Sequence, residues 1–153
     1  MADTAPASRP GFVVVTHGSL GMELLRVARY ILGERLDNFR AVEVPFMGEM
    51  QPAPTGEHPF ADRREKIRIA LAAAASEVDQ GGGVLILTDI LGGTSSNVAQ
   101  EVLTGRDGAV IAGVNLPMLL KAASLEATTV AEAADELVRR SRNAIQAPAT
   151  RKA

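Results

Sequence analysis

The sequence predicts an α/β protein built on one mostly parallel sheet with helices on both faces. Four short apolar runs alternate with segments whose apolar residues recur every three or four positions, and glycines stand between most of them. Such alternation is typical of a doubly wound sheet with right-handed crossovers. The length of 153 residues fits a single domain. We expect a strand order of about 2-1-3-4, a domain at 11–147, and loose tails at 1–10 and 148–153.

The first predicted strand covers residues 11–15, whose β-branched and aromatic side chains suit a strand buried on both faces. A helix follows Gly18, and Gly33 ends it because glycine readily adopts the left-handed conformation of a helix cap. The apolar positions of this helix fall on one face, which we expect to lie against the sheet. These positions are Leu20, Leu24, Val27 and Ile31.

The second strand is predicted at residues 40–46, where Pro45 limits its far end. The segment 45–59 is rich in proline, which predicts a loop that serves as a rim or lid. Asp62 and Glu65 have the spacing of a capping box, so the next helix is expected to open with Asp62 as its cap and to end at a triple glycine. Its predicted inner face carries Ile67, Leu71, Ala74 and Val78.

The third strand, residues 84–88, gives the strongest strand signal, because an apolar run flanked by glycines fits the centre of a parallel sheet. Asp89 stands at its end. A double glycine then forms a tight turn, and Thr94 or Ser95 can cap a helix that runs to about Leu103.

The fourth strand is predicted at residues 109–114, followed by a short helix with Pro117 near its N-terminus. Thr129 and Glu132 form a second capping box, and the last helix ends near Arg142.

The composition excludes several classes of function. Cysteine is absent, which removes disulfides and thiolate-held metal sites. The net charge of −2 and the 3% aromatic content argue against a nucleic-acid partner. No apolar run approaches the ~20 residues of a membrane helix. We therefore expect a cytoplasmic protein without direct membrane insertion, without a metal site and without a cofactor.

The candidate site lies at the carboxyl ends of the strands, where open parallel sheets bind ligands. His17 is the only nucleophile expected there near neutral pH. Asp89 follows the adjacent strand and could accept the Nδ1 proton of His17, which leaves the lone pair of Nε2 outward. The flanking residues place two helix N-termini and several hydroxyls where they could hold a phosphate group. These candidate phosphate-binding residues are Gly18, Ser19, Gly92, Gly93, Thr94 and Ser95.

The residues alone leave other interpretations open. A histidine at a strand end can simply bond locally, and a double glycine can form a turn without a ligand. His58 precedes Pro59 in the proline-rich loop and is expected to be solvated. A nucleotide-binding domain is disfavoured because no glycine-rich phosphate-binding motif follows a strand, and a hydrolase because no nucleophile elbow is present.

Three motifs at predicted strand ends carry a family resemblance. They are Thr16-His17-Gly18, Asp89-Ile90-Leu91-Gly92-Gly93-Thr94 and Gly113-Val114-Asn115-Leu116-Pro117-Met118. Together they resemble the mannose-family enzyme IIA of the bacterial phosphoenolpyruvate:sugar phosphotransferase system, from about residue 11 to residue 147. The order of three motifs is far more specific than any one of them.

The resemblance implies a phosphotransferase in sugar transport that works through a phosphohistidine. His17 would accept a phosphoryl group on Nε2 from the phosphocarrier protein HPr and pass it to a histidine of an enzyme IIB, while Asp89 orients it. Thr94 takes the place of a hydroxyl residue that helps to hold the phosphoryl group. The expected partner surface comprises Leu91, Asn115, Pro117 and Met118.

The family is commonly homodimeric, with an exchanged C-terminal edge strand for which residues 143–147 are the candidate here. Some transporting members have Trp at the position of Leu91 and Ser-Pro at Thr94-Ser95, so partner choice is expected to differ. Two alternatives remain: a regulatory phosphoprotein whose His17 state controls a partner, and the phosphoryl-transfer subunit of a dihydroxyacetone kinase.

Overall fold

Four parallel strands form the sheet in the order β2-β1-β3-β4, as the sequence predicted. A computed structural model describes residues 9–33, 36–46, 59–126 and 129–149. The strands are β1 (Gly11–His17), β2 (Phe39–Val44), β3 (Val84–Thr88) and β4 (Gly108–Ala112). The central strands β1 and β3 pair in parallel, so their carboxyl ends meet at one edge of the sheet.

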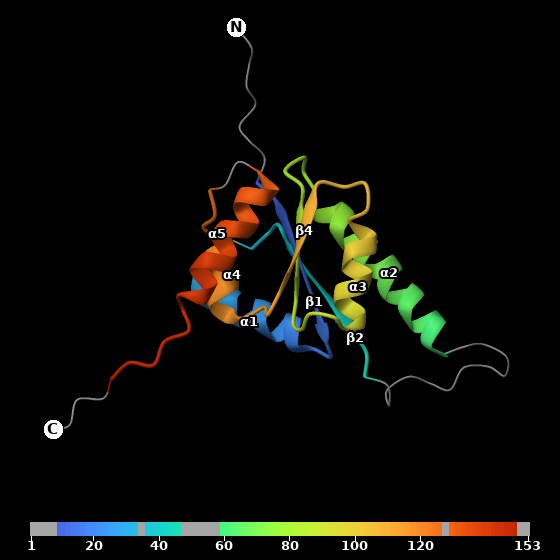
Figure 1. The fold of residues 1–153 in the computed structure, drawn as a ribbon, viewed down its shortest axis with the longest axis horizontal. Helices are drawn as coiled ribbons and strands as arrows, with labels where there is room; N and C mark the ends of the chain where they lie inside the picture. Colours follow the sequence, from blue (N-terminus) through green and yellow to red (C-terminus); the bar gives the residue numbers. More distant parts are fainter. Residues whose placement is uncertain (1–8, 34–35, 47–58, 127–128, 150–153) are drawn as a thin grey trace, which may run out of the picture.

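Helices cover both faces of the sheet (Figure 1). One face carries α1 (Leu20–Leu32), α4 (Leu116–Ala122) and α5 (Val130–Arg142), and the other carries α2 (Pro59–Val78) and α3 (Thr94–Val102). Each face has its own apolar core, because side chains alternate along a strand. In β1, Phe12 and Val14 enter the first core while Val13 and Val15 enter the second.

Several boundaries differ from the predicted ones for local reasons. β1 extends two residues further, to His17, which pairs with Val44 of β2. β2 spans Phe39–Val44 and stops before Pro45, which has no N–H to donate to a ladder. β4 spans Gly108–Ala112 because Gly113, with a φ of 86°, turns the chain away.

The predicted caps of α2 and α3 were wrong. α2 begins at Pro59, so Asp62 lies inside its first turn and pairs with Lys66. Proline suits this position because the first N–H groups of a helix have no intrahelical partner. In α3 the cap is Gly93, whose backbone is extended, and Thr94 is already helical. By contrast, Thr129 caps α5 as predicted, by accepting a hydrogen bond from the backbone N–H of Glu132.

The buried face of α1 is not the predicted one. The helix buries Gly21, Leu25 and Ala28, whereas Leu20 is 47% exposed and Ile31 is 52% exposed. A Cβ at Gly21 would lie 3.0 Å from both Thr16 Oγ1 and Val14 Cγ1. The helix therefore turns Gly21 toward the strand and approaches it closely, Leu25 fills the core beside it, and Leu20 and Ile31 remain outside. The predicted inner face of α2 is confirmed, since its four residues are buried.

Replacing Gly21 by valine should therefore destabilise the fold. The added side chain would clash with β1 and push α1 outward, which we expect to cost about 1–3 kcal/mol of unfolding free energy. Leu20→Ala is the matched control on the exposed side of the same helix, with an expected cost of about 0.5 kcal/mol. Urea unfolding measures the free energy of unfolding of both variants. Equal losses would contradict the burial of Gly21 against β1 and the exposure of Leu20.

Beyond α5, the described residues 143–149 form no strand. Residues 145–149 are exposed and have no regular secondary structure. The exchange of residues 143–147 between two chains stays a prediction. The predicted lid lies mostly outside the described residues, as does His58, because only Pro45, Phe46 and Pro59 of the segment 45–59 are described.

Candidate functional site

His17 and Asp89 meet at the carboxyl edge of the two central strands. The imidazole Nδ1 lies 2.9 Å from Asp89 Oδ2, and the backbone N–H of His17 donates to the same oxygen at 2.9 Å. The other carboxylate oxygen, Oδ1, accepts from the backbone N–H of Ile90 at 2.9 Å. Each carboxylate oxygen thus accepts a hydrogen bond from a backbone N–H. These two bonds fix the orientation of the Asp89 side chain independently of its contact with the imidazole.

The electrostatics of the pair decide which ring nitrogen is free. Partial burial raises the pKa of Asp89, but hydrogen bonds from the backbone and imidazole of His17 outweigh burial, and the pKa is lowered overall. An ionised carboxylate can only accept, so the neutral imidazole carries its proton on Nδ1. Nε2 therefore keeps a lone pair. The side chain of His17 is 36% exposed and that of Asp89 is 17% exposed, so the imidazole is the accessible partner.

The lowered pKa of Asp89 makes the stability of the fold depend on pH. A carboxyl group whose pKa is lower in the folded state stabilises the fold above its unfolded pKa, and this contribution disappears as the pH falls through the folded pKa. We expect Asp89→Asn to lose most stability relative to wild type near neutral pH and progressively less below about pH 4. Thermal unfolding of both proteins across this range measures the difference, and a pH-independent gap would contradict the linkage.

Two helices begin beside the histidine. Gly18, with a φ of 53°, turns the chain from β1 into α1. Ser19 forms no side-chain cap, and Thr16 takes this role from within the strand, its Oγ1 accepting the N–H of Gly21 at 2.7 Å. The second helix is α3, which starts after Gly93. Both helix N-termini present the positive ends of their dipoles at this edge, which favours a bound anion.

The double-glycine turn lies against the imidazole. Gly92 has a φ of 80°, and its N–H donates to Ser96 Oγ at 3.4 Å. A Cβ at Gly93 would lie 3.7 Å from His17 Cε1 and 3.9 Å from Ser95 Oγ. The Ser95 hydroxyl is buried and has no hydrogen-bond partner among the described residues. Thr94 is half-buried and Ser19 is exposed. Among the candidate phosphate-binding residues, Gly93 thus lies directly beside the imidazole.

Large apolar side chains are exposed just after β2 and β3, at the edge of the sheet that carries the histidine. Leu91 is 71% exposed, as its predicted role in a partner surface requires. Ile90 and Phe46 are exposed large apolar residues that the sequence analysis missed. Phe46 packs over Gly18, where an added Cβ would lie 2.6 Å from its ring. Its place as an aromatic last residue of the predicted strand 40–46 was the available signal for Phe46.

The turn before α4 contributes less to the surface than expected. Asn115 caps α4 by accepting the N–H of Met118 at 3.0 Å, and Pro117 occupies the first turn. Met118 is only 3% exposed and packs in the core. Its predicted place in a partner surface was therefore wrong, because the helical spacing that Asn115 initiates points this side chain toward the sheet.

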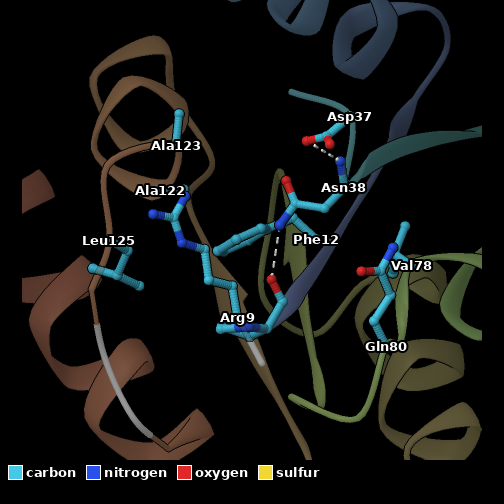
Figure 2. A pocket seen from close by; sticks show the side chains of 10 residues that line it. Arg9, Phe12, Asp37, Asn38, Val78, Gln80, Ala122, Ala123 and Leu125 are labelled. Carbon is cyan, nitrogen blue, oxygen red and sulfur yellow. Dashed lines mark hydrogen bonds between the residues drawn. The ribbon is translucent and has the colours of Figure 1, made fainter. Parts of the chain in front are cut away.

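The histidine site is a surface, and the cavity in Figure 2 lies elsewhere. That cavity has a volume of about 240 Å³ and is lined by Arg9, Phe12 and Asp37 among others, at the amino ends of the strands. Among the described residues, no group of three or more acidic or histidine side chains could hold a metal ion. No helix in the described ranges has the length and apolar character needed to cross a membrane.

Two solved structures share the fold of this chain. The mannose/sorbose-specific IIA subunit of the phosphotransferase system from Enterococcus faecalis superposes with a TM-score of 0.75 at 24% identity, covering 95% of this chain and 99% of that one. The phosphotransferase system component EIIA from Streptococcus agalactiae gives 0.70 at 22% identity, covering 90% and 95%. Both likenesses show that the chain shares the fold of these two phosphotransferase-system IIA components.

The particular family follows from the sequence comparison. The model of the EIIA-man family, described as the phosphotransferase system fructose IIA component, matches residues 11–142, and the chain belongs to this family. The mannose-specific EIIAB component of Escherichia coli (strain K12) is 30% identical over 110 residues. This match covers 71% of the chain and 29% of that relative, so the chain spans less than a third of the curated protein.

Proposed function

We propose that the chain is a phosphoryl carrier of the sugar phosphotransferase system. It accepts a phosphoryl group on Nε2 of His17 from HPr and passes it to a histidine of an enzyme IIB for sugar uptake, in the cytoplasm. One observation carries the proposal: Asp89 Oδ2 lies 2.9 Å from Nδ1 of an imidazole whose side chain is 36% exposed. This arrangement commits Nδ1 to the proton and leaves Nε2 as a nucleophile.

In the proposed transfer, each N–P bond that forms is matched by one that breaks, and no metal or cofactor takes part. The lone pair of Nε2 attacks the phosphorus of phosphorylated HPr, the new N–P bond forms, and the N–P bond to the donor histidine breaks with its electron pair returning to that histidine. The His17 ring gains positive character, and the ionised Asp89 stabilises it through the Nδ1–H bond. In the second transfer His17 is the donor. A nitrogen lone pair of the acceptor histidine of enzyme IIB attacks the phosphorus, and the N–P bond to His17 breaks with its electron pair returning to Nε2.

The surroundings of His17 suit a phosphoryl group during its transfer. Gly93 lies beside the imidazole, and the start of α3 directs free N–H groups toward this edge. Thr94 is half-buried at the first helical position, where its hydroxyl could bond a phosphoryl oxygen. The Ser95 hydroxyl is unpaired but covered, so it would reach the phosphoryl group only after a local shift of the turn.

A donor protein and an acceptor protein must both dock around one exposed histidine. Phe46, Ile90 and Leu91 offer apolar contact area around it. Solitary exposed apolar residues are common, but three at the carboxyl edge of the sheet form a surface that another protein could cover. We expect the carrier to be a homodimer, and light scattering on the purified chain tests that expectation separately from the transfer chemistry.

Intact-mass analysis after incubation with enzyme I, HPr and phosphoenolpyruvate tests the proposal. We expect one added phosphate that is labile to acid, as a phosphoramidate is, and that maps to His17. Addition of candidate IIB proteins should then remove it. A chain that takes up phosphate but passes it to no IIB would instead support the regulatory alternative. Absence of any phosphate would contradict both.

A further inference from the structure

The ring of Phe46 lies over the residue that follows the candidate nucleophile. A Cβ added at Gly18 would lie 2.6 Å from Cε2 and 2.8 Å from Cζ of this ring. The backbone N–H of Gly18 donates to the carbonyl of Val44 at 2.9 Å, so the end of β2 lies directly beside the turn after His17. Phe46 is nevertheless 52% exposed. Its side chain thus packs against the site and still offers surface to another protein.

The strand ladder does not hold Phe46 in this position. The pairing of β2 with β1 ends at Val44, opposite His17. Pro45 follows, and it has no N–H with which to continue the ladder. Arg63 supplies a contact at this point, because its Nη2 donates to the carbonyl of Pro45. A charged donor makes such a bond stronger than a backbone N–H would. Arg63 therefore holds the residue directly before Phe46.

Arg63 belongs to a firmly anchored helix. It lies near the start of α2, whose buried stripe packs against β2. Ile67 and Leu71 of this stripe are 3% and 0% exposed, and they follow Arg63 at intervals of four residues. Residues four apart share a face of a helix, so Arg63 continues the apolar stripe toward the carboxyl end of β2. An arginine at this position is a polar exception in the stripe, and the carbonyl of Pro45 explains it.

We propose that Arg63 is a positioning residue for docking of the phosphoryl donor and acceptor. By holding the Pro45 carbonyl it keeps the Phe46 ring over Gly18, so the apolar contact area beside His17 is formed before a partner arrives. A surface that is already ordered loses less conformational entropy on binding. The inference rests on the proposed function, and it assigns Arg63 an effect on docking that leaves the chemistry of the imidazole unchanged.

Proton NMR tests the contact without any phosphoryl transfer. The ring current of Phe46 shifts the resonances of Gly18, and Phe46→Ala gives their position without it. We expect Arg63→Met, which keeps the aliphatic stem but removes every donor, to move these resonances toward that position. Arg64→Met makes the same change one residue away, at a side chain that pairs with Glu101 of α3, and should leave them in place. Unmoved Gly18 resonances in Arg63→Met would overturn the proposal.

Rapid-quench transfer at increasing concentrations of phosphorylated HPr tests the role in docking. We expect Arg63→Met to raise the half-saturating concentration about fivefold and to leave the maximal transfer rate unchanged, with Arg64→Met at wild-type values for both. Arg63→Lys, which keeps a charged donor, should bring both readouts close to wild type, which a general loss of the fold would not allow. Because Arg63 acts through Phe46, the double variant Arg63→Met with Phe46→Ala should match Phe46→Ala alone.

The two readouts separate failure of the inference from failure of the proposed function. Wild type that accepts no phosphate would contradict the proposed function and the docking role together. If wild type is labelled but Arg63→Met keeps its half-saturating concentration, only the inference on Arg63 is overturned. Multiplying losses in the double variant would also overturn it, since Arg63 would then contact the partner itself and not act through Phe46.

Discussion

Replacement of His17 by alanine should abolish phosphorylation by HPr. The variant lacks the nucleophilic Nε2, and no other described side chain occupies its place beside Gly93 and Asp89. Loss of the nucleophile in a group-transfer site removes the covalent intermediate altogether, so we expect no phosphate in the intact mass at times when wild type is fully labelled. The fold should persist because the side chain is partly exposed and at the end of β1.

His58→Ala is the matched control, since it removes the only other histidine of the chain. We expect it to be labelled at the wild-type rate. Circular dichroism of both variants separates a lost nucleophile from a lost fold. Acid-labile phosphate on the His17 variant would refute the assignment of the phosphorylated residue.

Asp89→Asn should slow transfer by about 10²–10⁴-fold while the histidine remains present. An amide can hold the imidazole but can also donate to Nδ1, and this favours the tautomer whose lone pair faces inward. The amide also lacks the negative charge that stabilises the phosphorylated ring. Rapid-quench kinetics with phosphorylated HPr would measure the rate, and nitrogen NMR of the imidazole would report the tautomer.

Asp79→Asn is a suitable comparison because Asp79 Oδ1 bonds the N–H of Gly81 at the opposite end of the sheet. It makes the same chemical change in another loop and should leave the transfer rate unaltered. If the Asp89 variant transferred at the wild-type rate with an unchanged tautomer, Asp89 would be a structural residue of the strand end only.

The pairing of His17 with Asp89 could be anticipated because it depends on simple rules. Both residues follow strongly apolar strands, and in a parallel sheet the ends of neighbouring strands meet. The role of Asp89 in also binding two backbone N–H groups could not be read from spacing, because it depends on the precise path of β1 through His17. The same applies to Phe46, whose ring covers Gly18 only after β2 is placed beside β1.

Helix faces were harder to predict than helix positions. In α1 the apolar stripe suggested Leu20 and Ile31 as inner residues, yet the helix buries Gly21 and Ala28. Periodicity records which faces are apolar, but close packing decides which of two adjacent faces meets the strand. Met118 shows the opposite error, since a residue expected at the surface fills the core.

The sequence by itself determined the number and order of the elements, the parallel sheet, and the pairing of His17 with Asp89. Periodicity, glycine turns and caps are local properties that indicate where each strand ends. Because the carboxyl ends of neighbouring parallel strands meet at one edge of the sheet, these ends also predict where the site lies. Only the tertiary structure decided which face of α1 is buried, the covered position of Ser95, and the place of the Phe46 ring over Gly18. These features depend on side chains from segments distant in sequence, whose packing and charges act together only once the chain has folded.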